Sequence, residues 1–262
     1  MNPNLTVDVI IPVLNEAHVL EKSVETVRAY LRENLPCKWR VVVADNGSKD
    51  GTSEVAQKLV AAHPEDVALM QLELRGRGRA LRHAWMQSSA DIVGYMDVDL
   101  STELAAVPRA VRAITEEGYD IAIGSRLMRE SQTRRKFKRE FISQCYNIMV
   151  KSVLWTKFSD AQCGFKFVTR EVVERIVPQI KDQSWFFDTE MLVLGEKQGY
   201  RIKDLPVIWI EDDDSRVKIV QTAWDDIKGI LRLRRLLWSR SFAADAVAHS
   251  KRVPSPQQSV RG

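Results

Sequence analysis

The sequence predicts an α/β fold: one domain built on a central, largely parallel sheet flanked by helices. Through the first half of the 262 residues, short apolar runs rich in β-branched residues alternate with stretches whose apolar positions recur every three or four residues. Strands that alternate with helices in this way form parallel sheets. The chain is long enough for a substantial core, and its apolar fraction of 45% is ordinary for a globular protein.

Five apolar runs are the predicted strands. They lie at residues 7–13, 39–45, 67–74, 91–99 and 120–126. After the first run, Leu20, Val24, Val27 and Leu31 fall on one face of a helix, which Asn15 would cap. Further helices are expected after the second and third runs.

Beyond Arg126 the alternation becomes less regular. We expect helices at about 139–155 and 221–238, with a mixed segment between them. The expected organisation is a main domain of residues 1–220, an amphipathic helical segment of residues 221–243 and a disordered tail of residues 244–262.

The net charge of +4 is unevenly distributed. Residues 126–139 contain seven Lys or Arg and one Glu, and residues 221–262 contain eight Lys or Arg and three Asp. Each segment carries more positive charge than the whole chain, so the remainder is acidic. Local basic segments indicate anionic partners such as phosphates or a lipid surface. We expect no nucleic acid, because these segments lack interleaved aromatic residues that stack on bases.

The cysteines and histidines indicate neither a disulfide framework nor a zinc site. The three cysteines are scattered without CxxC spacing, and the four histidines are dispersed. The chain begins without a basic-then-apolar signal segment, and no apolar run approaches 18 residues. We therefore expect a cytoplasmic protein that does not cross a membrane, although it can lie on the cytoplasmic face of one.

The stretch VGYMDVDLST, residues 93–102, places Asp97 and Asp99 at the end of a buried strand. Residues two apart in an extended chain face the same way, so both carboxylates can point at one spot. Without a cation they would repel each other. Mg²⁺ is typically held by one or two carboxylates together with substrate phosphates, so a metal–diphosphate site is the simplest interpretation. A solvated turn that caps the next helix is the alternative.

Polar residues follow two other strands at the same predicted edge of the sheet. They are Pro12 to Glu16 after the first strand and Asp45 to Gly47 after the second. Ligands of open α/β sheets bind beyond the carboxyl ends of the strands, although turns also favour Asn, Asp and Gly for structural reasons. The stretch RGRGRA, residues 75–80, adds glycines and cations at a helix start, which suits phosphates.

Seven motifs together resemble the family-2 glycosyltransferases of the GT-A fold, specifically the polyprenyl (dolichyl) phosphate sugar synthases. The resemblance runs from about Val7 to Arg240 and is strongest to the dolichyl-phosphate glucosyltransferase branch. In order, the motifs are VIIPVLNE, VVVADNGSKDGT, MDVDLST, AIGSR, SDAQCGFK, FFDTE and DSRV. Eukaryotic members of that branch carry an N-terminal membrane anchor, which we do not expect here.

The resemblance implies a metal-dependent, inverting transfer of a hexose, expected to be glucose, from a UDP-sugar to a polyprenyl phosphate. It implies that Asp97 and Asp99 bind Mg²⁺ or Mn²⁺. Catalytic roles would fall to Asp99, Asp160 and Arg216, and the acceptor phosphate would bind Arg126 and Arg139. The remaining implied contacts are with the nucleotide sugar, at Pro12, Leu14, Asn15, Glu16, Asp45, Gly76, Arg77, Asp97, Val98, Gln162, Asp188 and Glu190.

An acceptor phosphate is already ionised at neutral pH, so this chemistry depends on positioning and charge neutralisation more than on a strong base. Asp160 as a base is therefore optional. Asp188 and Glu190 could instead be first-turn charges of a helix. A soluble or polysaccharide acceptor, or a nucleotide-binding regulator without catalysis, are the alternative functions. The basic segments favour a lipid acceptor, and the intact Asp97, Asp99 and Arg216 argue against the regulator.

The expected C-terminal helix has one broad apolar half, interrupted by Asp226 and Arg234. A helix with tryptophans, an apolar face and a basic face can lie in a membrane interface. Alternatively, the apolar half packs on the main domain. Its members are Ala223, Trp224, Ile227, Ile230, Leu231, Leu237 and Trp238.

Overall fold

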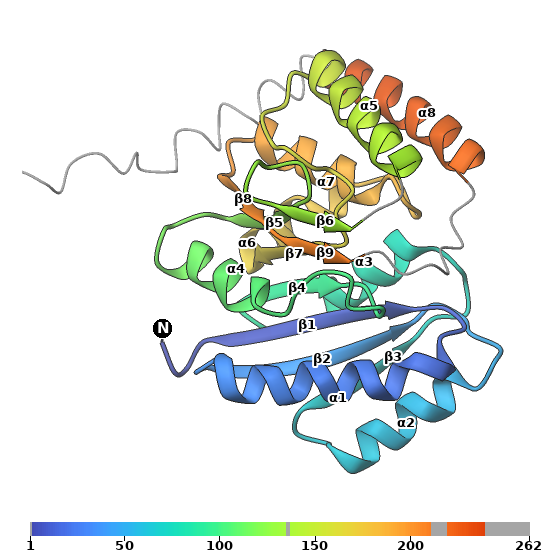
Figure 1. The fold of residues 1–262 in the computed structure, drawn as a ribbon, viewed down its shortest axis with the longest axis vertical. Coiled ribbons are helices and arrows are strands. Elements are labelled where there is room, and N and C mark those ends of the chain that lie inside the picture. The colour runs from blue at the N-terminus through green and yellow to red at the C-terminus, as the bar shows by residue number, and fades with distance from the viewer. Residues whose placement is uncertain (1, 135–136, 211–218, 239–262) are drawn as a thin grey trace, which may run out of the picture.

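The computed structural model describes residues 2–134, 137–210 and 219–238. A seven-stranded sheet in the order β3-β2-β1-β4-β7-β5-β8 lies between two layers of helices (Figure 1). Neighbouring strands are parallel, except that β7 runs antiparallel to both β4 and β5. The predicted α/β fold with a mostly parallel sheet is confirmed.

The sheet contains all five predicted strands and two from the less regular part of the chain. The strands are β1 (Thr6–Val13), β2 (Lys38–Asp45), β3 (Val67–Gln71), β4 (Ile92–Met96), β5 (Ile121–Ser125), β7 (Phe165–Thr169) and β8 (Ile202–Pro206). A separate two-stranded parallel sheet is formed by β6 (Gln132–Arg134) and β9 (Ile208–Ile210).

Helices connect most of the strands. They are α1 (Ala17–Asn34), α2 (Thr52–Ala62), α3 (Arg77–Gln87), α4 (Ala106–Thr115), α5 (Phe137–Leu154), α6 (Arg170–Arg175), the 3₁₀ helix η1 (Val177–Gln179), α7 (Phe187–Lys197) and α8 (Ile219–Leu237). The tail predicted at residues 244–262 lies outside the described residues, as do residues 239–243 of the predicted helical segment.

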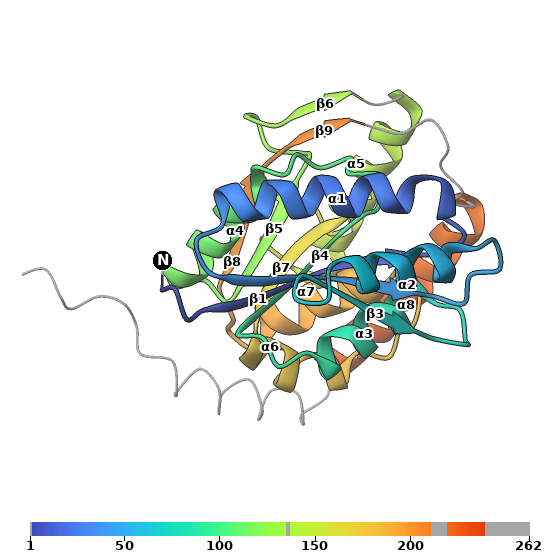
Figure 2. The same cartoon turned by 90° about the horizontal axis from the view of Figure 1, so that it is seen from below.

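Both faces of the sheet are buried, which is why its strands are continuous apolar runs. Val9 and Ile11 of β1 belong to a core shared with α1, α2 and α4. Ile10 points to the opposite face, into a core shared with α3, α5, α6, α7 and α8. Figure 2 shows α1 and α4 on one side of the sheet and α3 and α6 on the other.

Helix α8 packs beside α5 and completes the second core, in which Ile230 and Leu233 are buried (Figure 1). Gly229 lets α8 pack closely on Phe186, the residue before α7, because a Cβ at position 229 would lie 2.5 Å from the Phe186 ring. Trp224 and Leu231, which the sequence places in the same apolar half of the helix as Ile230, are exposed. Both alternatives for this helix therefore have a structural basis: one stripe packs on the domain and another faces solvent.

Candidate active site

Parallel strands β1, β2, β4 and β5 end at the same edge of the sheet, and sequence-predicted site residues follow each of them. Strand β4 ends at Met96, earlier than the sequence predicts. Asp97 and Asp99 therefore lie in the turn after the strand, where Leu100 has a positive φ of 54°. The alternation of an extended strand, from which we expected the two carboxylates to share a face, does not apply to them.

The turn after β1 is held by the turn after β2. The Asn15 backbone N–H donates to Ser48 Oγ at 2.9 Å, and the Lys49 N–H donates to Asn15 Oδ1 at 2.8 Å. Asn15 has a φ of 58°, and the N-cap position of α1 is Glu16. The expectation that Asn15 caps this helix was wrong, because its side chain is used across the two turns. Pro12 and Leu14 flank the first turn and are half-buried.

Asp45 is buried at the last position of β2. Its Oδ1 accepts from the Ser48 backbone N–H at 3.0 Å, and its Oδ2 accepts from the Ser53 hydroxyl. These bonds fix the orientation of the carboxylate within the turn. The structure therefore places Asp45 at the predicted edge of the sheet, as an anchor of the turn between β2 and α2.

The glycines of RGRGRA have a packing role. A Cβ on Gly76, whose φ is +149°, would lie 2.5 Å from the Gln183 carbonyl oxygen, and one on Gly78 would lie 2.6 Å from Phe187 Cβ. Glycine at both positions lets the start of α3 approach the segment before α7. The Gly76 N–H donates to Asn46 Oδ1 at 2.8 Å, which joins this turn to the one after β2.

Arg77 connects two carboxylates at the centre of the site. Its Nη2 donates to Asp97 at 2.9 Å, and its Nη1 donates to Asp188 at 2.7 Å. The guanidinium also stacks on the rings of Tyr95 and Trp185. Arg77 is mostly buried, and the two carboxylates outweigh its desolvation and raise its pKa above the ordinary value. It therefore remains charged.

Asp97 rests against the backbone of Gly164. A Cβ at Gly164 would lie 1.7 Å from Asp97 Oδ2, so a side chain at position 164 cannot coexist with this carboxylate position. The Asp97 side chain is about a third exposed at 32%, Val98 is buried, and Asp99 is exposed. Asp99 Oδ1 accepts from the Ser101 N–H at 2.9 Å.

A buried lysine lies beneath these carboxylates. Lys166 is completely buried, and its ammonium donates to the Cys163 carbonyl at 2.6 Å and to the Tyr95 hydroxyl at 3.2 Å. The Tyr95 hydroxyl in turn donates to Asp188 at 2.7 Å. Lys166 Nζ lies 3.7 Å from the same Asp188 oxygen. Two cations, Arg77 and Lys166, thus balance Asp97 and Asp188.

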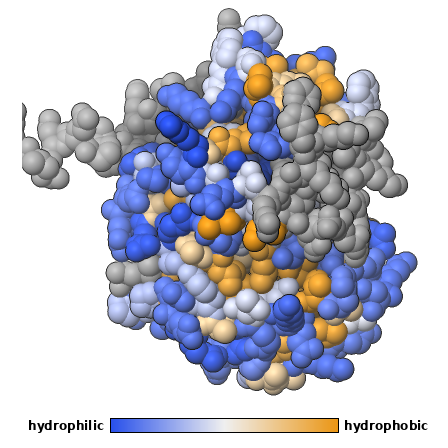
Figure 3. Space-filling model, viewed as in Figure 1, coloured by the Kyte–Doolittle hydropathy of each residue, from blue (hydrophilic) through white to orange (hydrophobic). Residues whose placement is uncertain are grey.

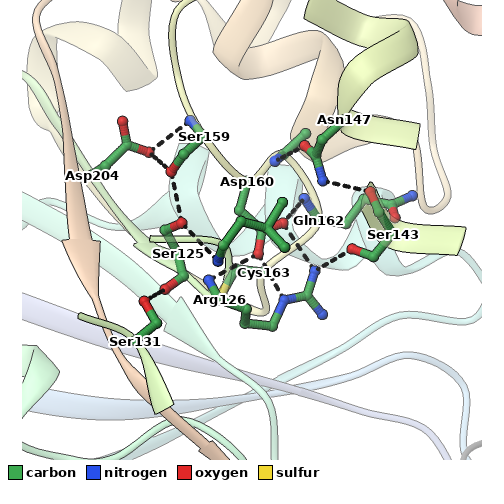
Figure 4. Close-up of polar contacts among 12 residues, drawn as sticks. Ser125, Arg126, Ser131, Ser143, Asn147, Ser159, Asp160, Gln162, Cys163 and Asp204 are labelled. Atoms are coloured by element: carbon green, nitrogen blue, oxygen red, sulfur yellow. Dashed lines mark hydrogen bonds and ion pairs between the residues drawn. The ribbon is translucent and has the colours of Figure 1, made fainter. Parts of the chain in front are cut away.

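Arg126 and Asp160 form a second buried ion pair (Figure 4). Arg126 Nε and Nη2 donate to the two Asp160 oxygens at 2.7 and 2.9 Å. Burial alone would raise the pKa of the Asp160 carboxyl, but the Arg126 guanidinium outweighs it and lowers the pKa to about 2. Within the part of the chain that the structure describes, Arg126 Nη1 has no hydrogen-bond partner.

Asp160 to Gly164, hereafter the 160–164 loop, is held from several sides. The Ala161 N–H donates to Asn147 Oδ1 on α5 at 2.9 Å. The Gln162 side chain donates to Asp226 of α8 at 3.1 Å. Since Asp160 pairs with Arg126 and Gly164 supports Asp97, this loop connects the two charged clusters of the site.

The structure separates Glu190 from Asp188, although both lie in the first turn of α7. Glu190 Oε2 accepts from Arg232 of α8 at 2.5 Å and from the Asp182 N–H at 2.9 Å. It contributes to the packing of α8, whereas Asp188 faces Arg77. Arg139 lies in the first turn of α5, and its side chain is not among those described; Arg216 lies outside the described residues.

Asp97 and Asp99 offer the oxygen ligands that hard divalent cations prefer. The Asp97 carboxylate occupies the space that a Cβ at Gly164 would fill, so this carboxylate lies beside the 160–164 loop at the edge of the sheet. In the described ranges, no three His, Cys, Asp or Glu side chains group together as a metal site. Asp97 and Asp99 could contribute two such ligands, and an ion held there would take its other ligands from elsewhere.

Sequence reasoning missed Tyr95, Gly164, Lys166 and Asp226. Tyr95 and Lys166 stand opposite each other in the antiparallel pair of β4 and β7. The signal available in the sequence was a lysine inside the apolar run FKFV, because a charge in a buried strand requires partners. Asp226 had a similar signal, as a charge inside an apolar helix face.

Comparison with known proteins identifies relatives of this chain. Residues 8–177 match the model of glycosyl transferase family 2. Glycosyltransferase AglD of Haloferax volcanii is 35% identical over 216 residues, which is 82% of this chain and 35% of that protein. The dolichyl-phosphate beta-glucosyltransferase of Dictyostelium discoideum is 27% identical, covering 88% of this chain and 74% of its own length. The mouse enzyme of that name is 28% identical, with 82% and 71% covered.

Solved structures share the fold. Glucosyl-3-phosphoglycerate synthase from Mycobacterium tuberculosis, in complex with Mn²⁺, UDP-glucose and phosphoglyceric acid, has a TM-score of 0.65 at 18% identity, covering 88% of this chain and 79% of its own. Mannosyl-3-phosphoglycerate synthase from Rubrobacter xylanophilus has a TM-score of 0.66 at 18% identity, with 88% and 75% covered. The chain spans about a third of the length of AglD. The family match covers most of the chain and the resemblance seen in its motifs is confirmed, so this protein belongs to glycosyltransferase family 2 and has the GT-A fold.

Proposed function

We propose that this protein transfers glucose, with inversion, from UDP-glucose to a polyprenyl phosphate. The observation that carries the proposal is the 160–164 loop, which supports Asp97 at one end and Arg126 at the other. A transferase of this kind needs a carboxylate that binds the donor metal and a cation that binds the acceptor phosphate, held at a constant separation. Relatives named dolichyl-phosphate beta-glucosyltransferase support the acceptor and the sugar.

Asp97 and Asp99 would hold Mg²⁺ or Mn²⁺, which when bound neutralises the departing diphosphate. Arg126 would bind the acceptor phosphate through Nη1, with Arg139 as a second expected ligand, and Arg216 would approach the diphosphate. Asp160 keeps the Arg126 guanidinium in place. Because its pKa is about 2 and both oxygens accept from Arg126, Asp160 does not take up a proton at neutral pH. The phosphate nucleophile is already ionised and needs no base.

Asp45 would contact the uracil base, and the turn of Leu14 to Glu16 would contact the nucleoside. Gly76, Arg77 and Val98 would border the diphosphate. Gln162 and Asp188 would face the sugar, whose hydroxyls are donors to carboxylate and amide oxygens. Glu190 is bonded to Arg232 of α8, so its effect on the sugar site would be indirect, by holding α8 in place.

The test is an incubation of the protein with Mg²⁺ and single nucleotide sugars, each with polyprenyl phosphate or with 3-phosphoglycerate. Mass spectrometry should identify a glucosyl lipid phosphate formed from UDP-glucose. A better yield from GDP-mannose would overturn the donor assignment. Transfer to 3-phosphoglycerate alone would replace the lipid by a soluble acceptor.

Asp99→Ala is expected to lower the rate of transfer by about 100-fold or more, because an ion bound by Asp97 alone would be poorly placed on the diphosphate. Titration calorimetry with UDP, with and without Mg²⁺, should show that the variant loses the metal-dependent part of the affinity. Glu103→Ala, which removes a carboxylate that pairs with Arg109, is the matched control and should keep it. Unchanged Mg²⁺-dependent affinity in the Asp99 variant would refute the metal assignment.

The surface of α5 and α8 offers a route to a lipid. No described helix is long and apolar enough to span a bilayer. Apolar side chains nevertheless gather over these two helices (Figure 3). Arg234 stacks between Trp155 and Trp238 at 4.4 and 4.9 Å, which adds a cation to the apolar surface. The exposed apolar residues are Ile142, Ile148, Trp155, Trp224, Ile227, Leu231 and Trp238. We propose that this surface contacts the cytoplasmic face of a membrane.

Replacing Trp224 and Leu231 together by Ala is expected to lower sedimentation with anionic liposomes by about tenfold or more, because each apolar side chain removed from water contributes roughly 1.5–3 kcal/mol. UDP binding should not change, since neither residue is buried in the core. Leu74 and Met86 are exposed elsewhere on the chain, and their double Ala variant is the control. Equal sedimentation of both variants would argue against the α5–α8 surface.

A further inference from the structure

Asp226 is a buried carboxyl on a helix that the family match does not reach. It is 3% exposed and lies on α8, beyond residues 8–177. In the sequence it interrupts an apolar helix face. In the structure this position is turned inward, and the neighbouring Asp225 is exposed and paired with Lys228. Burying a carboxyl costs free energy unless the group is hydrogen-bonded, so its partner is of interest.

The partner of Asp226 is the side chain of Gln162, whose Nε2 donates to Asp226 Oδ2 at 3.1 Å. Gln162 is half-buried and belongs to the 160–164 loop. Its backbone N–H is bonded to Asp160 Oδ1 at 3.1 Å, so its side chain is the group through which α8 reaches the loop. Movement of α8 would therefore be transmitted to the residues between Asp160 and Gly164.

Contacts with Phe186 and Glu190 fix the position of α8 along its own axis relative to the start of α7. Gly229 packs against the Phe186 ring, and Arg232 donates to Glu190 at 2.5 Å. These two contacts lie about one and two turns further along α8 than Asp226. They fix the height of the Asp226 carboxyl relative to Gln162.

The surroundings of Asp226 favour its protonated form. Burial, and then the charge of Asp182, raise the pKa of Asp226 to about 7, while the Gln162 hydrogen bond acts against this rise. Asp225 on the same helix also contributes, and Tyr146 of α5 interacts electrostatically with Asp226 as well. The folded-state pKa lies above the value of 3.8 in an unfolded chain, so the contribution of Asp226 to stability falls as pH rises towards 7.

We propose that Asp226 is a positioning residue that holds Gln162, and through it the 160–164 loop, in place for catalysis. Its catalytic meaning rests on the proposed function, because that loop supports Asp97 and Arg126. The hydrogen bond itself does not depend on which sugar or acceptor is used. The Gln162 amide donates to either form of the Asp226 carboxyl, so the hold of α8 on the loop does not depend on which form is present.

The first measurement is hydrogen exchange of the peptide that covers the 160–164 loop, which does not require activity. Asp226→Leu should raise its exchange rate about tenfold, the size of one lost hydrogen bond, while Asp226→Asn should preserve it because the amide oxygen still accepts. Asp225→Leu is the matched control and should have no effect.

The second measurement is transfer kinetics, with Gln162→Leu as a variant that removes the same bond from the loop side. Asp226→Leu and Gln162→Leu should each lower kcat about tenfold and leave UDP affinity unchanged within about twofold. Because both remove the same hydrogen bond, the double variant should lose no more kcat than either single variant. Unchanged loop exchange in both variants overturns the inference. Altered exchange with normal kcat overturns the catalytic meaning. If the variants alter loop exchange but the wild-type protein transfers no sugar, the positioning role is supported and the proposed function is refuted.

Discussion

Gly164→Ala is expected to abolish sugar transfer in a protein that remains folded. The new Cβ would occupy the position of Asp97 Oδ2, so the carboxylate must rotate away. The displacement of a catalytic group by about 1 Å can lower a rate by about 100-fold. Mg²⁺-dependent binding of UDP should be lost together with activity, and calorimetry measures it directly.

Gly195→Ala is the matched control, because it makes the same change at a buried glycine far from the charged clusters. Its Cβ would lie 2.9 Å from Ile121 Cδ1, the flexible end of a side chain that can move. We expect this variant to keep both UDP binding and transfer. A Gly164→Ala enzyme with normal Mg²⁺-dependent UDP affinity would show that Asp97 is not needed where the structure places it.

Lys166→Met should lower the free energy of unfolding by about 3–5 kcal/mol, the usual result of removing one partner of a buried charged network. The Cys163 carbonyl would lose its bond from the ammonium, and Asp188 would keep Arg77 as its remaining cation. Chemical denaturation at neutral pH measures the change.

Lys203→Met, on strand β8, provides the comparison, because Lys203 pairs with Glu117 at the surface. This variant should lower the free energy of unfolding by less than about 1 kcal/mol. A change of similar size in both variants would mean that the buried network contributes little. If Lys166→Met is folded but inactive, the Cys163 carbonyl and the 160–164 loop are the first places to look for altered structure.

The fold and one side of the site could be predicted because they depend on local patterns. Apolar runs mark the strands, and Asp45 and Asp97 stand where parallel strands end. The prediction that the strand continues through Asp99 was wrong after Met96. The end of a strand depends on its hydrogen bonds to neighbouring strands, and the apolar run does not specify those neighbours. The opposing charges of each cluster lie far apart in the sequence: Arg77 and Asp188 are separated by 111 residues, and Arg126 and Asp160 by 34.

Strand β7 explains most of what could not be predicted. It runs antiparallel between β4 and β5, and this insertion brings Lys166 opposite Tyr95 and Gly164 against Asp97. No local pattern in FKFV specifies its two neighbours. The inward turn of Asp226 was equally hidden, because a helical wheel groups residues by face and does not say which face meets which partner.

Arg77 is a resident counter-ion for two carboxylates of the candidate site, Asp97 and Asp188. If the site binds a nucleotide and its metal as proposed, their departure would leave no unbalanced cluster of negative charge. The carboxylates can therefore keep their places in an empty enzyme. Under the proposed function, divalent metal would arrive with each nucleotide sugar and would not be a permanent part of the structure, so removing that metal should stop transfer without unfolding the protein.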